Sequence, residues 1–260
     1  MRPTSLPREM TTRTSIEHKY STAILTNIDC PRETVPIRRI GKENLRKANS
    51  FSQSYVSDIH PRTEEFPGLH IAFLASLNQQ TYYGVRASLS LNNPKVGAKQ
   101  SSTSQMWIQS ERSDTLNEIR LQFISWLMQD SSTSNWWLVV DDKVHIGYFP
   151  ASLFKELNGG SSNVAWGALA KSVPGSPSPA MGTGERINLA ILDWSFVGYF
   201  YNLTVMDSSN SFVNPRPHSL IPYVDTAANP ACYDLIYDDY LGPFRGHGIK
   251  FGGPGGDCGS

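Results

Sequence analysis

Short runs of aromatic and β-branched residues recur along the chain from Phe66 onward, and apolar and polar positions alternate in many of them. Alternation with a period of two is typical of a strand that lays one face on a core. Clusters of Gly, Pro, Asn and Ser bound the runs, as turns require. Many short strands with frequent turns indicate an all-β sandwich or barrel. The runs lie at residues 70–77, 81–91, 104–110, 135–149, 163–170 and 199–207.

Local signals predict where these strands end. Asp141 and Asp142 divide the run 135–149 into two halves, which predicts a tight antiparallel connection even though the favoured Asn-Gly or Asp-Gly pair is missing. Asn92-Asn93-Pro94 predicts a strand end, because proline has no N–H to donate to a neighbouring strand. The composition of residues 171–185 predicts a loop.

Two stretches favour helix instead. In residues 150–160, Pro150 suits a first helical turn and two glycines close the segment. Leu153, Phe154 and Leu157 would share one face of that helix. A second short helix is predicted over residues 41–51, within a charged region (1–65) that is sparse in aromatic residues.

Charge and hydropathy exclude several classes of partner. The chain has 23 Lys and Arg against 23 Asp and Glu, and this balance argues against a nucleic-acid binder, which needs clustered excess cations. No apolar run approaches the roughly 18 residues of a membrane span, and the first residues lack the apolar core of a signal peptide. We therefore expect neither nucleic acid nor membrane as a partner.

The cysteines leave two alternatives open. Cys232 and Cys258 lie near the C-terminus, whereas Cys30 stands alone, so one of the three has no partner within the chain. A bridge between Cys232 and Cys258 would stabilise the fold by roughly 2–4 kcal/mol. The alternative is two reduced thiols in an intracellular protein.

Motifs for catalysis by familiar constellations are missing. The sequence contains no Gly-x-Ser-x-Gly, its six histidines are scattered, and no His or Cys spacing suits zinc. The Gly-rich segment 251–259 follows no strand-to-helix pattern, so a phosphate-binding loop is not expected. We predict no metal and no cofactor. Asn202-Leu203-Thr204 is an N-glycosylation sequon, which matters only in an exported protein.

The carboxylates alone do not define a site. Adjacent acids such as Asp238 and Asp239 point to opposite faces of a strand and cannot share a proton. Glu118 would lie on the same strand face as Arg120, and a nearby cation lowers a carboxyl pKa, the wrong direction for a general acid. Residue chemistry by itself therefore indicates an all-β globular domain and no more.

Nine stretches follow one another along the chain in a particular order: Cys30–Arg39, Tyr82–Val96, Ser104–Ile108, Asn135–Leu138, Ile146–Phe154, Met181–Gly184, Tyr199–Asp207, Cys232–Asp234 and Phe251–Cys258. In their wording and order they resemble the plant neprosin family. The resemblance implies a partial activation-peptide region at 1–60 and a neprosin domain at 66–260 that is shortened between 108 and 135. Members of that family are secreted glutamic endopeptidases that cut after proline and fold as a sandwich of two antiparallel sheets. The resemblance thus implies an extracellular protein, a Cys232–Cys258 disulfide and a peptide or protein substrate.

The resemblance also implies that the catalytic acids have been lost. The first family glutamate lies in a motif like LNxIEAGW, and here the matching words are LNEIR, with Arg120 at the glutamate position. The second lies in a stretch like IEWGGEV, which reads VAWGALA here, so that Ala165 and Leu169 occupy both glutamate positions. Glu118 is a slipped candidate for the first acid.

Three interpretations follow. An active peptidase would need Glu118 together with a second acid such as Glu156 or Glu185. A catalytically silent protein would bind peptides or cell-wall material through exposed aromatics such as Trp136, Trp137 and Trp166, although core packing is the expected role for at least half of these. Alternatively, the chain is the product of a gene model that lacks an exon, which transcript sequencing across residues 107–136 would test.

Overall fold

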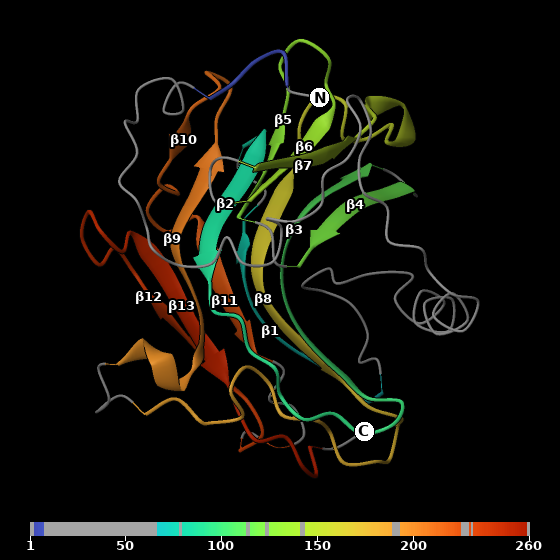
Figure 1. Cartoon of the computed structure of the whole chain (residues 1–260), viewed down its shortest axis with the longest axis vertical. Helices are drawn as coiled ribbons and strands as arrows, with labels where there is room; N and C mark the ends of the chain where they lie inside the picture. The colour runs from blue at the N-terminus through green and yellow to red at the C-terminus, as the bar shows by residue number, and fades with distance from the viewer. Residues whose placement is uncertain are drawn as a thin grey trace.

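The computed structural model describes residues 3–7, 67–77, 80–112, 115–122, 125–140, 144–188, 193–224, 229 and 231–258. Within these residues the protein is almost entirely β-structure, and two antiparallel sheets pack face to face (Figure 1). The expected all-β sandwich is confirmed.

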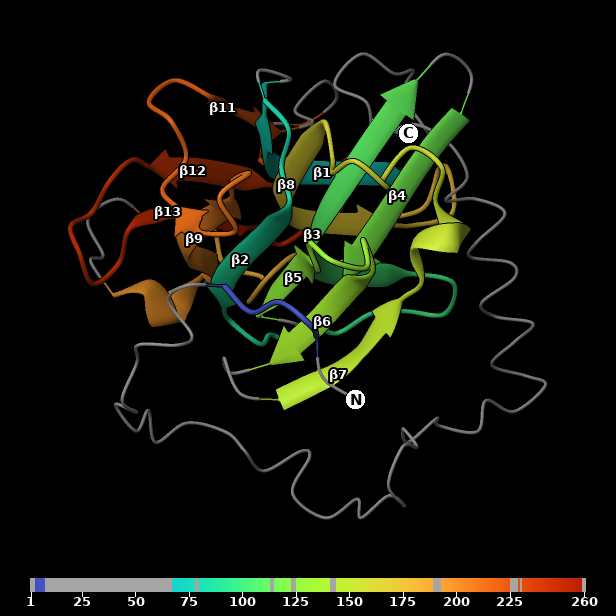
Figure 2. The same ribbon diagram turned by 90° about the horizontal axis from the view of Figure 1, so that it is seen from above.

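The smaller sheet has five strands and the larger has eight. Figure 2 shows the strands of both sheets from above. The five-stranded sheet has the order β11 (Leu220–Val224), β1 (Leu69–Ser76), β8 (Asn163–Lys171), β3 (Ser101–Arg112) and β4 (Thr115–Leu121). The eight-stranded sheet has the order β12 (Asp234–Asp238), β13 (His247–Gly252), β9 (Gly198–Met206), β2 (Gly84–Leu89), β5 (Trp126–Gln129), β6 (Trp136–Val140) and β7 (Val144–Phe149), and β10 (Phe212–Val213) pairs with β9.

The main core lies between the sheets. On β8, the central strand of the smaller sheet, Val164 and Trp166 point into this core and are fully buried. Phe200 of β9 and Phe251 of β13 face them from the larger sheet and are also buried. The strand predicted at residues 163–170 is confirmed, and its even-numbered residues form the core face.

The opposite face of the five-stranded sheet is apolar as well. Phe73, Trp107, Ala165 and Leu169 alternate with core residues on their strands and form a second buried cluster. A strand buried on both faces has no need for polar side chains. This explains why residues 164–170 contain no ionisable group.

Several connections follow the sequence signals. β6 and β7 pair as antiparallel neighbours, with the predicted connection at 141–143 outside the described residues. β2 ends at Leu89, before Asn92-Asn93-Pro94. Residues 172–188 form no strand, only turns and isolated bridges, so the predicted loop is confirmed.

The single helix predicted at residues 150–160 is wrong. Only a short 3-10 helix, η2 (Ala151–Leu153), forms, and the chain turns extended at Phe154 with φ −131°. This turn sends Leu157 into the core and leaves Leu153 63% exposed, so the apolar residues share no helical face. The helix predicted at 41–51 lies outside the described residues.

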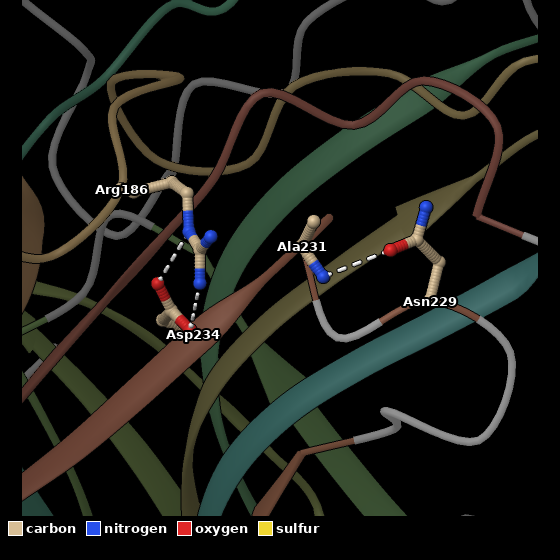
Figure 3. Close-up of polar contacts among 4 residues, drawn as sticks. All are labelled: Arg186, Asn229, Ala231 and Asp234. Atoms are coloured by element: carbon tan, nitrogen blue, oxygen red, sulfur yellow. Dashed lines mark hydrogen bonds and ion pairs between the residues drawn. The ribbon is translucent and has the colours of Figure 1, made fainter.

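The C-terminal end of the domain is cross-linked. Cys232 and Cys258 form a disulfide, which settles the alternative left open by the sequence. Just before Cys232, Asn229 Oδ1 accepts a hydrogen bond from the Ala231 amide at 2.9 Å (Figure 3). Just after Cys232, Asp234 accepts a bidentate pair of hydrogen bonds from Arg186, at 3.0 and 3.2 Å. In the part of the chain that the structure describes, we find no helix long and apolar enough to cross a membrane.

Candidate functional site

The positions implied for the family acids lie in one row across the outer face of the five-stranded sheet. Arg120 on β4 stands opposite Trp107 on β3, and Trp107 stands opposite Ala165 on β8. One strand, β3, lies between β4 and β8, so their backbones are about 10 Å apart at the usual strand spacing. The fold brings these two positions together from segments 45 residues apart in sequence.

The same register separates Ala165 from Leu169. Leu169 stands opposite Thr103 on β3 and Ile71 on β1, well along β8 from the row that contains Arg120. Of the two residues matched to a family glutamate on β8, Ala165 is therefore the one placed to face a partner on β4.

Glu118 lies on this outer face, in the row next to Arg120. Its Oε1 accepts a hydrogen bond from Arg120 Nε at 2.5 Å, and the two side chains are 15% and 19% exposed. Across the sheet from Glu118 lie Gln109 and then Asn163, both uncharged. The carboxylate of Glu118 is therefore engaged by a guanidinium, and its row supplies no second acid.

Glu156 lies at the end of the same sheet, next to a β4 residue whose side chain is on the opposite face from Glu118. Its amide donates to Asn117 Oδ1 at 3.1 Å, and Asn117 alternates with Glu118 along β4. A polar depression of about 320 Å³ at this end is lined by residues that include Lys155, Glu156 and Ser161. Glu156 belongs to that depression and not to the row of Arg120.

Glu185 is remote from both positions. Its backbone carbonyl lies against Gly252 of β13, in the eight-stranded sheet. The structure therefore places neither Glu156 nor Glu185 beside Glu118 on the outer face of the five-stranded sheet.

The three tryptophans named for a binding role are buried, and core packing was the expected role for at least half of them. Trp136, Trp137 and Trp166 all have almost no accessible surface, and core packing is their role. Partly exposed aromatics of the eight-stranded sheet include Tyr199 of β9, whose ring meets that of Trp194, in the 3-10 helix η3 (Trp194–Phe196), edge to face.

The glycosylation candidate Asn202 lies in the middle of β9. It adopts a left-handed φ of 55°, and the register of β9 against β13 shifts beside it. Its amide donates to the Arg245 carbonyl at 2.7 Å. The sequon is thus on a strand, and modification of Asn202 stays a prediction. Among the described residues, no group of three or more His, Cys, Asp and Glu is arranged to hold a metal ion.

Trp107 was not foreseen as part of the site, yet it stands between Arg120 and Ala165 and is 3% exposed. Strand alternation was the available signal, because Met106 and Ile108 are typical core residues and place Trp107 on the opposite face.

These features define a class: a disulfide-linked antiparallel β-sandwich with a row of implied acid positions on the outer face of its smaller sheet. A family model described as Neprosin matches residues 121–254, which is 134 of the 260 residues. The chain belongs to the neprosin family.

Proposed function

We propose that this chain is a catalytically impaired relative of the glutamic endopeptidases that cut after proline, and that it acts as a non-catalytic peptide-binding sandwich. The observation that carries the proposal is the row Arg120–Trp107–Ala165. A guanidinium and a methyl group, with an indole between them, stand where the family resemblance implies two carboxylates.

Peptide hydrolysis by two carboxyl groups requires one to activate water as a base and the other to protonate the departing amine. Arg120 remains a cation at any working pH and can perform neither step. Ala165 has no ionisable group. Glu118 is the acid nearest this row among those considered, and its carboxylate is already engaged in an ion pair with Arg120.

Burial points the same way. Ala165 is 1% exposed and Trp107 is 3% exposed, so the middle of the row offers a substrate no surface. A scissile bond therefore cannot reach these two side chains in the present arrangement.

The test is incubation of the purified full chain with a proline-containing peptide at acidic pH, followed by mass spectrometry. We expect no cleavage after proline, and no change in Glu118→Gln. The exposed Asp257→Asn, which is none of the candidate acids, is the matched control for contaminating protease. Cleavage that survives Asp257→Asn and disappears in Glu118→Gln would overturn the proposal. Saturable, uncleaved binding of the same peptide, measured by fluorescence anisotropy, is the expected positive result.

A second candidate ligand is a cell-wall polymer, and the partly exposed pair Trp194 and Tyr199 supports it. Trp194 lies edge to face with Tyr199, and the cations of Arg245 and Lys250 lie 5.3 and 5.2 Å from the Trp194 ring. Aromatic rings flanked by hydrogen-bonding groups suit sugar rings as well as peptides. Co-sedimentation with insoluble wall polysaccharide tests this, and Trp194→Ala would abolish it. Tyr148→Ala, which removes an exposed ring from β7 at the other edge of the eight-stranded sheet, would not.

We also propose that the protein folds in the secretory pathway, where a disulfide such as Cys232–Cys258 persists. Expression through a secretory route, followed by glycosidase treatment, is the test. A mobility shift that Asn202→Gln abolishes is expected, and its absence would remove the glycosylation part of the proposal.

A further inference from the structure

A short N-terminal segment, Pro3–Pro7, is docked on the turn between β5 and β6. It appears as the blue trace at the top of the molecule in Figure 1, beside the β5–β6 turn. Its contacts are with residues more than 120 positions away in sequence, and residues 8–66 lie between the segment and the first described strand region. This docking is separate from the row of Arg120 and does not rest on the proposed function.

Asp130 is the centre of the contact. Thr4 donates to Oδ2 twice, from its amide at 2.6 Å and from its hydroxyl at 2.7 Å. Ser5 donates to Oδ1 from its hydroxyl at 2.9 Å, and its amide approaches Oδ2 at 3.4 Å. Asp130 is itself 1% exposed, so this carboxylate is satisfied largely by the segment. Hydrogen bonds to an ionised acceptor are about twice as strong as neutral ones.

Two further hydrogen bonds hold the segment at Ser5 and Leu6. The Ser131 amide donates to Ser5 Oγ at 3.0 Å, and Asn210 Nδ2 donates to the Leu6 carbonyl at 3.1 Å. Pro3 and Pro7 are buried, whereas the Leu6 side chain is exposed. The segment thus places two adjacent hydroxyl residues and two buried prolines against this surface, whereas the side chain of Leu6 remains exposed.

We propose that Asp130, Ser131 and Asn210 form a binding site for an extended peptide of the type Pro-Thr-Ser-x-Pro, and that this site retains Pro3–Pro7 after the chain is cut within residues 8–66. Such a cut breaks none of the contacts described above. It converts an intramolecular contact into a bimolecular one, so retention then depends on protein concentration.

The ionised state of Asp130 supports retention in acid. Burial raises the pKa of Asp130, but hydrogen bonds from the Thr4 hydroxyl, the Ser132 and Thr4 amides and the Ser5 hydroxyl outweigh it and lower the pKa to about 2. Among the described residues, the groups that donate hydrogen bonds to this carboxylate are hydroxyls and backbone amides, none of which titrates in this range. We expect retention to be the same at pH 7 and pH 5.

The experiment uses the full chain with a site-specific protease sequence inserted between Asn49 and Ser50. After cutting, size-exclusion chromatography separates free fragment from bound fragment. We expect the N-terminal fragment to co-elute with the domain, and Ser5→Ala or Asp130→Asn to reduce the retained fraction at least tenfold under the same conditions.

Two controls keep the outcome decisive. Ser5→Ala alters the segment and leaves the domain sequence intact, so misfolding does not account for its effect, and Asp239→Asn removes an exposed carboxylate elsewhere. A labelled Pro-Thr-Ser-Leu-Pro peptide should compete with the fragment, whereas Pro-Thr-Ala-Leu-Pro should not. Complete separation of the wild-type fragment, or equal retention by the wild type and Ser5→Ala, overturns the proposal.

Discussion

Arg120 follows Glu118 by two positions on β4, and its Nε donates to Glu118 Oε1 at 2.5 Å. The two side chains point to the same outer face because strand residues two apart share a face. Both are largely shielded from solvent, at 19% and 15% exposure. An ion pair in this setting is costly to break from one side, since the remaining charge stays in a partly desolvated place.

This pair yields the first prediction. Glu118→Gln should destabilise the fold by about 1–2 kcal/mol, because the guanidinium of Arg120 loses its charged acceptor. Urea unfolding followed by tryptophan fluorescence measures the change. Asp234→Asn breaks the more exposed contact with Arg186 and should cost less. A Glu118→Gln variant as stable as the wild type would show that the pair adds nothing to the fold.

Strand positions were more predictable than strand faces. Alternation in residues 163–170 indicated a strand, and Val164 and Trp166 do face the core. It could not reveal that Ala165 and Leu169 are buried too, because a strand covered on both faces loses the polar half of its pattern. β11 was missed because Pro222 interrupts its pattern, yet proline is tolerated there since β11 is an edge strand.

The contact partners of the site depend on the fold in a way that sequence could not reach. Glu118 and Arg120 were placed on one face from local alternation alone. Their relation to Ala165 required the order β8–β3–β4, in which a distant strand becomes a near neighbour. Asp130 gave no local signal, because its partners Thr4 and Ser5 are 125 or more positions away.

The disulfide gives the second prediction. Cys232→Ser together with Cys258→Ser should lower the free energy of unfolding by about 2–4 kcal/mol, since the bridge restricts the unfolded chain. Reductant should destabilise the wild type by a similar amount and leave the double variant unchanged. A double variant that still responds to reductant would point to another redox-sensitive group.

Gly167 supplies the third prediction. It pairs with Phe73 of β1, and a Cβ added at Gly167 would lie 2.3 Å from the Ala72 carbonyl oxygen and 2.6 Å from Phe73 Cα. Backbone atoms cannot yield as a flexible side chain would. Gly167→Ala should therefore destabilise the protein by about 2 kcal/mol or more.

A second strand glycine is the matched control for this substitution. An added Cβ at Gly147 of β7 meets no atom within 4 Å, so Gly147→Ala should be neutral or slightly stabilising. Thermal unfolding of the two variants under identical conditions makes the comparison. Similar melting temperatures would mean that β1 and β8 are not as closely packed as described.

His247 carries the last prediction, which concerns pH. It is 6% exposed, its Nδ1 lies 2.8 Å from the Tyr237 hydroxyl, and the Asp239 carboxylate lies 3.1 Å away. Tyr240 also packs on the ring. Burial lowers the pKa of His247 below 6.5, and Asp239 opposes part of this shift. The neutral ring is therefore the form that the fold favours.

The sign of the pH dependence follows from that shift. The contribution of a buried neutral His247 to the free energy of unfolding is fully present above the unfolded-state pKa of about 6.5. It is lost as the pH falls from there through the lower pKa of the folded state. NMR titration of the ring protons should give a midpoint below 6.5 in the wild type and a lower one in Asp239→Asn, because the opposing charge is gone. His247→Gln should flatten the fall in melting temperature between pH 7 and pH 5. A midpoint above 6.5, or one that Asp239→Asn raises, would contradict the burial of a neutral ring.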